Sequence, residues 1–394
     1  SSYICALINT KVILIPIPHF VTINNISLLL FYLLVAFFAI QLIYYLFVFV
    51  RLALHKTVNE PVSEIEPPVS IIICARNELK NLKANLQRVL EQDYPRYQVI
   101  VVNDCSWDES EKYLEELSAT YKHLKIVSIK EQERYQHGKK FALTIGIKSA
   151  LFDHLLLIDA DCYPASNQWM RLMMQPYKQQ TRIVIGYGAY IKSSSILNRW
   201  VRFDTAFNAM QYLSFALSGN PYMGVGRNLS YQRSLFFENK GFARHQHIMS
   251  GDDDLFINDT ATAENLSVQI NPDSFTYSQP KTDFIDWFRQ KKRHISASRL
   301  YKFKHKFLLG IYYFSHISFL VLFLALLIIQ FKIEYVVTAF SLRLVFQMII
   351  FGSCLKKLKE GDLIPFIPVF DIWIAVVYPL IAISNRLIKT KTWK

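Results

Sequence analysis

The stretch VSIIICARNELKNLKANLQRVLEQDYPRYQVIVV, residues 69–102, decides the fold. Its opening run, Val69–Cys74, is apolar on both faces, which is typical of a strand buried inside a parallel sheet. Leucines and a valine then recur at helical spacing over residues 79–92. The tripeptide DYP at 93–95 ends this helix, and QVIVV at 98–102 forms a second buried strand. The stretch therefore predicts a strand, a helix and a second strand.

The same alternation continues downstream. The pattern predicts a charged helix over 108–121, a strand over 124–129, a helix from about 138 to 151, and a fourth strand at Leu155–Ile158. Strands that alternate with helices in this way favour a mostly parallel, doubly wound α/β sheet. Ligands of such sheets bind at the carboxyl ends of the strands.

Glycine-rich phosphate loops are missing from the sequence. CARNEL, which follows the first strand, contains no glycine, and no G-x-x-x-x-G-K-[ST] occurs, so NAD and P-loop chemistry are disfavoured. The pairs Gly186–Gly188 and Gly224–Gly226 stand alone and are interpreted as turns.

Apolar stretches flank this central region. Residues 28–50 carry no charge and are long enough to cross a bilayer. Basic residues follow directly at 51–56, so the positive-inside rule places the central region in the cytoplasm. Residues 307–330 and 335–353 are expected to form a pair of spans joined by a tight turn.

The last apolar stretch, 363–384, has two interpretations. It contains three prolines and an aspartate, and both the preceding loop at 354–362 and the tail after it are basic. A simple span would place the basic tail outside, against the charge rule. A broken, re-entrant or interfacial segment is therefore as well supported as a true span.

The chain is expected to divide into five parts. These are an N-terminal segment (1–27) without the features of a cleaved signal peptide, a membrane helix (28–50), a Pro- and Glu-rich linker (51–68), a soluble domain (69–300) and a membrane region (301–394).

Charge and cysteine content narrow the class of protein. The net charge is +13, and many basic residues lie at 281–306, beside a predicted span, where they suit anionic membrane lipids. This placement argues against nucleic acid as a partner. The five cysteines show no C-x-x-C spacing, which indicates a reduced compartment and neither a disulfide framework nor a zinc site.

Acidic and amide side chains follow three of the predicted strands: ARNE at 75–78, ND at 103–104 and DAD at 159–161. Helix capping would explain any one of them, and three together point to a ligand site. The D-x-D puts Asp159 and Asp161 on one side of an extended segment. Two carboxylates and substrate phosphate oxygens typically hold Mg²⁺ or Mn²⁺, although an Asx turn is the alternative. The implied chemistry stabilises a departing diphosphate.

The segment SGDDDL, residues 250–255, places three carboxylates side by side. Adjacent like charges raise one another's pKa. The spacing of Ser250 and Asp253 is similar to a capping box, so a helix start accounts for part of the cluster. A metal site and a catalytic base are the alternatives.

Seven motifs occur in a fixed order: VSIIICARNE, VIVVNDCSWDES, HGKKFAL, LLLIDAD, GVGRNLSYQRSLF, SGDDDLF and QKKRH. In this order they resemble the family 2 glycosyltransferases, inverting enzymes whose GT-A fold is a Rossmann-like, mostly parallel α/β architecture. The resemblance covers about residues 69–300. The flanking spans are similar to those of the membrane-bound branch, which includes cellulose- and hyaluronan-type synthases and lipid glycosyltransferases.

The resemblance implies a nucleotide site at the first two strand ends. Ala75, Asn77 and Glu78 match the loop that meets the base and ribose, and Asp104 matches the acidic residue that reads the uracil edge.

The resemblance also implies a diphosphate and metal site. Lys139 matches a basic residue near the diphosphate, with Lys140 as its competitor. Asp159 matches the ribose and metal side of the D-x-D, and Asp161 matches the direct metal ligand.

The segment SGDDDL matches the family element E-D-x-D-L. Gly251 then stands where a glutamate is usual, Asp252 takes the position of the catalytic base, and Asp254 takes the second acidic position. A base is needed because the acceptor hydroxyl loses its proton as it attacks the anomeric carbon. Asp253 remains a candidate for the base, although both an extended and a helical geometry give its side chain a structural role.

The segment QKKRH matches the family element Q-x-x-R-W. Gln290 and Arg293 agree with it, and His294 replaces the tryptophan that stacks on the acceptor sugar in processive synthases. The smaller ring argues against processive synthesis, whereas the arginine suits a diphosphate. The aromatic segment 196–223 is expected either at the membrane surface beside the acceptor path or as a core helix.

The sequence therefore predicts a multi-pass enzyme of the bacterial inner (plasma) membrane with a cytoplasmic GT-A domain. It would transfer a sugar from a nucleotide-sugar, a UDP-sugar in particular, to a lipid-linked or membrane-presented glycan acceptor in cell-envelope synthesis. The alternatives are a processive polysaccharide synthase and a metal-dependent nucleotidyl- or phosphotransferase, for which the Q-x-x-R element has no use. A catalytically silent scaffold would not need the acidic strand ends.

Overall fold

The computed structural model describes residues 3–8, 11–16, 23–56, 66–130, 138–246, 248 and 250–387. The chain divides into two compact units: one comprises residues 1–45 and 309–347, and the other residues 46–308 and 348–394. Half of the predicted linker (57–65), His137 of the HGKK motif and the basic tail from residue 388 lie outside the described residues. The predicted domain limits stay a prediction.

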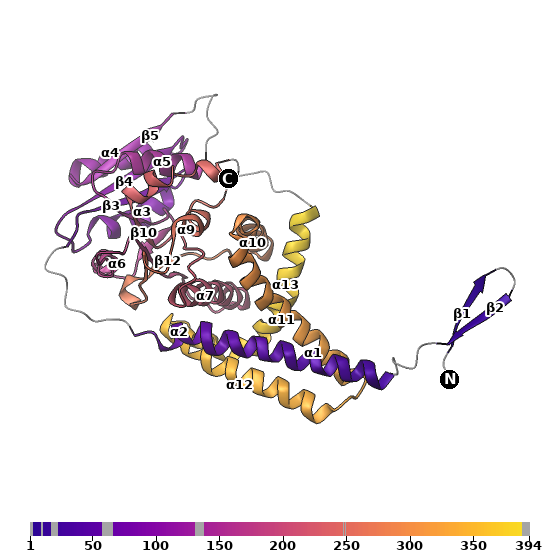
Figure 1. The fold of residues 1–394 in the computed structure, drawn as a ribbon. Helices are drawn as coiled ribbons and strands as arrows, with labels where there is room; N and C mark the ends of the chain where they lie inside the picture. The colour runs from indigo at the N-terminus through magenta and orange to yellow at the C-terminus, as the bar shows by residue number, and fades with distance from the viewer. Residues whose placement is uncertain are drawn as a thin grey trace. The chain divides into compact units, whose positions relative to one another are not determined.

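The larger unit is built around a central sheet in the order β11-β8-β10-β6-β3-β4-β5. Figure 1 labels β3, β4, β5 and β10 of this sheet. Strand β10 runs antiparallel to β6 and β8, and the other neighbours in the sheet pair in parallel. This confirms the predicted mostly parallel sheet. Its strands are β3 (Val69–Ala75), β4 (Tyr97–Asp104), β5 (Leu124–Ile129), β6 (His154–Leu157), β8 (Ile183–Ile185), β10 (Leu229–Gln232) and β11 (Leu266–Val268).

The first half of this unit agrees with the predicted alternation of strands and helices. Strands β3, β4, β5 and β6 are separated by α3 (Leu79–Leu90), α4 (Ser110–Thr120) and α5 (Lys139–Lys148). On one face of β3, Ile71 and Ile73 join a buried cluster with Leu82 and Leu86 of α3. On the other face α5 approaches closely, since a side chain at Gly146 would lie 2.8 Å from Ile72. The strands are apolar on both faces because both faces are covered.

A second, smaller sheet begins directly after the D-x-D. Its order is β7-β12-β9, with β7 (Cys162–Pro164), β12 (Thr276–Ser278) and β9 (Gly188–Tyr190). The interpretation of Gly186–Gly188 as a turn is wrong at Gly188, which opens β9. A side chain at Gly186 would lie 2.5 Å from the Asn228 amide, so close packing explains this glycine. Short helices α6 (Trp169–Met174), α8 (Arg233–Glu238) and α9 (Asp254–Thr260) complete this part.

Three longer helices pack together in the larger unit: α7 (Ile196–Leu217), α10 (Phe284–Ala297) and α13 (Ile367–Leu387). The Trp200 ring on α7 contacts Trp287 of α10 and Phe370 of α13 edge-on. Trp200, Phe203 and Phe207 are buried, so the aromatic segment predicted for this region is a core helix.

The smaller unit consists of α1 (Ile23–Ile43), the hairpin β1 (Tyr3–Ile8) and β2 (Lys11–Pro16), and parts of α11 (Phe303–Ile328) and α12 (Ile333–Lys357). Gln41 on α1 donates through Nε2 to the Tyr312 carbonyl (3.1 Å) and the Ser315 hydroxyl (2.7 Å) of α11. Rings of Phe323 and Phe340 stack between α11 and α12. Buried polar pairs and close aromatic contacts are how apolar helices associate within a membrane.

Within the described residues, four helical segments are long and apolar enough to cross a membrane: Asn25–Leu54, Phe303–Ile328, Ile333–Lys357 and Gly361–Asn385. The first three correspond to the predicted spans 28–50, 307–330 and 335–353. The fourth contains the stretch with two interpretations. This fourth segment begins with a short 3₁₀ helix, Gly361–Phe366, and continues as α13, which contains Pro379.

Candidate active site

The D-x-D lies where the central sheet meets the second sheet. Asp159 follows β6, and Asp161 directly precedes β7. The ligand atoms of Asp159, Asp161 and Cys162 all lie within 4.8 Å of one another. Burial raises the pKa of the Cys162 thiol well above its ordinary value, and the charges of Asp161 and Asp159 raise it further. The Cys162 thiol donates to Asp161 Oδ1 at 3.3 Å. The two carboxylates beside it are a donor set that fits Mg²⁺ or Mn²⁺.

Lys139 joins the D-x-D to the aspartate cluster. It is the first residue of α5, and its Nζ lies 2.9 Å from Asp159 Oδ1 and 3.0 Å from Asp252 Oδ2. Burial opposes its charge, but Asp159 and Asp252 prevail and raise the pKa of Lys139 well above its ordinary value. The competing Lys140 instead donates to the carbonyls of His245 (2.7 Å) and Ile248 (3.2 Å). Of these two neighbouring lysines, Lys139 is therefore the one that faces the carboxylates.

The carboxylate of Asp252 faces the recess at the strand ends. Burial raises the pKa of Asp252, but the attraction of Lys139 and the hydrogen bond from it together outweigh this effect. The net pKa is below the usual value, so the group is ionised at neutral pH. The recess is lined by Ile72, Cys74, Lys139, Leu143, Leu157, Ile158, Asp159, Gly226 and Asp252.

The next two aspartates are held by the protein itself. Asp253 caps α9: its Oδ1 accepts from the Asp254 amide (2.8 Å) and its Oδ2 from the Gly226 amide (2.7 Å). Asp254 accepts from the Tyr301 hydroxyl at 2.8 Å. Burial and the neighbouring carboxylates raise the pKa of Asp253 to about 6 and that of Asp254 to about 7. The three aspartates therefore have three different environments.

Gly251 explains why the usual glutamate is missing before Asp252. Its φ is +91°, in the region that favours glycine. A Cβ at this position would lie 2.4 Å from Leu255 Cδ1. The backbone that turns Asp252 toward Lys139 leaves no room for a side chain at residue 251.

The predicted nucleotide residues lie on two loops that are tied together. Ala75 ends β3 beside Asn103 of β4, and the next residue, Asp104, is 1% exposed. Asn77 adopts a left-handed backbone conformation with φ +55°. Its side-chain Oδ1 accepts a hydrogen bond from the backbone amide of Trp107 (2.9 Å), and its backbone amide donates to Ser106 Oγ (2.9 Å).

The side chain of Glu78, the last residue of this loop, bonds within the next helix and not to the second loop. Glu78 precedes α3, and its side chain accepts from Asn81 within that helix.

The Q-x-x-R-H element lies on α10, beside the second sheet. Gln290 approaches the Tyr190 hydroxyl at 3.4 Å, and the Arg227 guanidinium lies 4.6 Å from the centre of the same ring. His294 is an exposed residue, and partial burial of its ring together with the cations Arg293 and Lys291 lowers its pKa. His294 is therefore a neutral hydrogen-bonding ring at neutral pH.

Arg227 is a site residue that the sequence motifs did not single out. Burial opposes its charge, but Tyr190, Cys162 and the two D-x-D carboxylates raise its pKa. It also donates to Ser278 Oγ at 3.1 Å. The available signal was its place directly after GVG in the motif GVGRNLSYQRSLF.

Comparisons with known proteins agree with this architecture. Residues 70–238 match the family model "Glycosyl transferase family 2". A poly-beta-1,6-N-acetyl-D-glucosamine synthase from Staphylococcus epidermidis is 28% identical over 163 residues, which cover 40% of this chain and 37% of the relative. The relative named "Probable glycosyltransferase YdaM" from Bacillus subtilis is 26% identical over 238 residues, which cover 58% of this chain and 54% of the relative. The chain thus spans between about one third and about one half of the curated relatives it matches.

One solved structure shares the fold over most of the chain. It is the mannosyltransferase PcManGT from Pyrobaculum calidifontis, in complex with GDP-Man and Mn²⁺. The TM-score is 0.55 at 16% sequence identity, and the match covers 89% of this chain and 98% of that one. At this level of sequence identity, the similarity shows a shared fold and nothing more. Residues 70–238 are therefore similar to the family 2 glycosyltransferases, and the chain shares the fold of this mannosyltransferase, the GT-A architecture that the sequence predicts.

Proposed function

We propose that this protein is a membrane-bound, inverting glycosyltransferase. It transfers a sugar from a nucleotide-sugar, a UDP-sugar in particular, to a lipid-linked or membrane-presented glycan acceptor in cell-envelope synthesis. The observation that carries the proposal is the position of Lys139, which contacts both Asp159 of the D-x-D and Asp252 of the aspartate cluster. A diphosphate site and a candidate base therefore share one recess at the carboxyl ends of the strands.

The donor is held by two sets of residues. Ala75, Asn77, Glu78 and Asp104 bind the nucleoside at the ends of β3 and β4. Lys139, Arg227 and Arg293 supply the positive charge that a diphosphate requires, since ammonium and guanidinium groups bind phosphate oxygens well.

Asp159 and Asp161 hold a divalent cation, Mg²⁺ or Mn²⁺. When bound, the cation neutralises the diphosphate charge that develops as the glycosidic bond to the nucleotide breaks. Mn²⁺ is the ion in the mannosyltransferase of the same fold, which supports a divalent ion here.

Asp252 accepts the proton of the acceptor hydroxyl. Lys139 depresses the pKa of Asp252 and so keeps it ionised, and movement of Lys139 away from it restores its basicity. Lys139 is released from Asp252 when the donor diphosphate attracts its ammonium group, which makes the carboxylate available to the acceptor. Attack from the face opposite the leaving nucleotide inverts the anomeric carbon. Gln290 and His294 line the acceptor side as neutral hydrogen-bonding groups.

The catalytic domain faces the cytoplasm of a bacterial inner membrane. The basic residues at 51–56 and in the segment 281–306 support this orientation by the positive-inside rule. Anionic membrane lipids are partners of the second of these basic segments.

A processive polysaccharide synthase is the second candidate. The similarity to a poly-beta-1,6-N-acetyl-D-glucosamine synthase favours it. His294, in place of the stacking tryptophan, argues for few transfers per acceptor. The length distribution of products from one acceptor distinguishes the two candidates.

The donor site is tested by Asp161→Ala. The change should abolish metal-dependent hydrolysis of, or transfer from, a UDP-sugar in membranes. Cys162→Ser is the matched control, because it alters the neighbouring group and leaves both carboxylates in place, so it should keep activity. Activity in Asp161→Ala equal to the parent would contradict the proposal.

A further inference from the structure

Helix α13 has two apolar faces with different surroundings. Phe370, Ile374, Val377 and Ile381 are buried against the rest of the larger unit. The opposite face repeats at helical spacing and is 44–62% exposed: Val369, Ile372, Trp373, Val376, Leu380 and Ile383. A contiguous apolar face of this size on the outside of a folded unit marks an interaction surface.

The buried face is attached to the catalytic domain along the whole helix. Near its start, Phe370 contacts the Trp200 and Phe203 rings of α7. In its middle, the Tyr378 hydroxyl donates to Asp204 of α7 at 2.6 Å. Near its end, Asn385 donates to the carbonyl of Lys292 on α10 at 3.0 Å. Helices α10 and α13 accordingly lie side by side (Figure 1).

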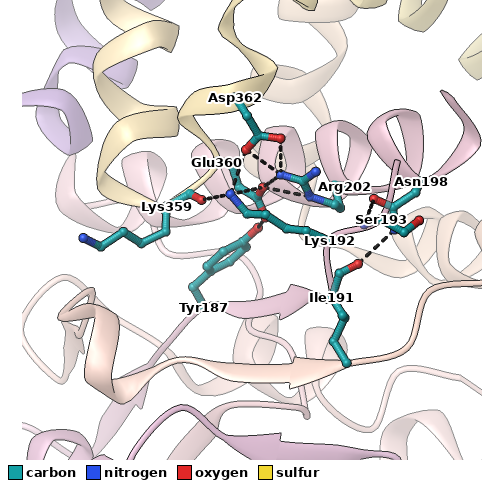
Figure 2. A network of polar contacts seen from close by, with 9 residues as sticks. All are labelled: Tyr187, Ile191, Lys192, Ser193, Asn198, Arg202, Lys359, Glu360 and Asp362. Atoms are coloured by element: carbon teal, nitrogen blue, oxygen red, sulfur yellow. Dashed lines mark hydrogen bonds and ion pairs between the residues drawn. The ribbon is translucent and has the colours of Figure 1, made fainter. Parts of the chain in front are cut away.

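The segment that leads into α13 is fixed to the same domain. Arg202 of α7 donates to Glu360 (3.0 Å through Nε) and to both oxygens of Asp362 (2.7 and 2.8 Å), as Figure 2 shows. Lys192 donates to the Lys359 carbonyl and to Asp362, both at 2.7 Å. Both ends of α13 are therefore held by the catalytic domain.

The charges beside α13 are incompatible with the hydrocarbon core of a bilayer. The α10 side chains Asp286 and Arg289 are 56% and 72% exposed. They precede Lys291, whose ammonium lies 4.9 Å from the centre of the Tyr378 ring on α13. The Asp286 and Arg289 side chains form an ion pair at 3.3 Å. If α13 crossed the bilayer, this exposed pair would accompany its middle into hydrocarbon, where a single charged side chain costs about 2.5–3.5 kcal/mol.

We propose that α13 does not cross the membrane but lies in its surface, with the face from Val369 to Ile383 inserted among the lipids. This proposal rests on the proposed membrane location of the enzyme. The partner is a lipid bilayer, because α13 follows candidate span α12 after nine residues and basic side chains at 281–306 suit anionic headgroups. Trp373 lies on the inserted face, and tryptophan favours the membrane interface. The chain then crosses with α1, α11 and α12, and both ends of α13 stay on the catalytic side.

Site-directed spin labelling measures this orientation directly. Single cysteines at Val369, Val376 and Ile383 lie on one face at intervals of seven residues and are labelled in a background without native cysteines. The protein is reconstituted in vesicles of phosphatidylethanolamine and phosphatidylglycerol, and depth is measured by power saturation with oxygen and a nickel chelate. Val345→Cys on α12 is the deep reference, and Glu116→Cys on α4 is the aqueous reference.

The proposal predicts one depth at all three positions, about 5–10 Å into the interface, and shallower than Val345. It is overturned if Val376 is as deep as Val345 while Val369 and Ile383 are shallow, which is the profile of a span. It is also overturned if all three labels are as accessible to nickel as Glu116. The depth readings do not depend on sugar transfer, so failure of the proposed function would appear separately in the activity assay.

Discussion

Two polar clusters in the larger unit each place a cation between two carboxylates, and they differ in exposure. In the recess, Lys139 (27% exposed) contacts Asp159 (33%) and Asp252 (10%). Behind α7, Arg202 (1% exposed) contacts Glu360 (2%) and Asp362 (46%) (Figure 2). In the second cluster Lys192 is a further cation, 2.7 Å from Asp362. Both clusters join segments that are far apart in the sequence.

The difference between the two cations indicates how each cluster is used. A lysine presents a single ammonium on a flexible stem, so it can leave one carboxylate for another anion. An arginine presents a rigid fork, and a buried fork with two acidic partners fixes a geometry. The half-exposed lysine cluster therefore suits exchange with a substrate, whereas the buried arginine cluster fastens the loop before α13 to α7.

Arg202→Ala should give the largest loss of stability. Removing one partner of a buried ion pair leaves an uncompensated charge and typically costs about 3–5 kcal/mol. The free energy of unfolding, measured in detergent, should fall by this amount, while UDP affinity of the folded fraction should stay at the parent value. Arg202→Lys is the control and should fall by less. An unchanged unfolding curve would contradict the structural role of this cluster.

Lys139→Met should give a smaller loss of stability and a selective loss of donor binding. A charged hydrogen bond is worth about 1.5–3 kcal/mol, so UDP-sugar affinity should fall by about tenfold or more. Isothermal titration measures this change. Lys140→Met is the matched control, since Lys140 bonds to backbone carbonyls: it should lower stability and leave donor affinity intact. The comparison is contradicted if Lys140→Met lowers donor affinity while Lys139→Met leaves it unchanged.

Asp254→Asn should change only the pH dependence of stability. The pKa of Asp254 is about 7 in the folded protein, above the value near 3.9 expected when unfolded. The folded state thus holds the proton more tightly, and this contribution is complete below pH 4 and is lost as pH rises through 7. The melting temperature of the parent should decline from pH 5 to 8, and the decline should be smaller in Asp254→Asn. Equal declines would show that this carboxyl does not titrate there.

Local pattern was sufficient for the first half of the catalytic domain. The strands β3, β4, β5 and β6 are buried apolar runs between helices with clear periodicity, and both features are visible in short windows. Strands β8, β10 and β11 were not predicted, because they are short and, unlike the equally short β6, lie outside the regular alternation of strand and helix. The orientation proposed for 363–384 likewise rests on tertiary contacts, since hydropathy alone gives a surface helix and a span the same signal.

The site residues could be proposed from the sequence, but their arrangement could not. Asp159 and Asp252 are far apart in the chain, and nothing local indicates that Lys139 lies between them. The choice between Lys139 and Lys140 depended on which ammonium meets backbone carbonyls. Arg227 was missed because its importance comes from its neighbours, Tyr190 and the D-x-D, on other segments.

The central claim is that Asp252 is the base of a sugar transfer whose donor lies at the D-x-D. It is tested most directly by measuring single-turnover transfer and UDP binding in Asp252→Asn, with Asp253→Asn as the neighbouring control. The account predicts that Asp252→Asn lowers the transfer rate by about 10²–10⁴-fold with UDP affinity retained. In Asp253→Asn it predicts mainly a loss of stability, because Asp253 caps α9. Parental transfer in Asp252→Asn, or loss of transfer in a stably folded Asp253→Asn, would contradict it.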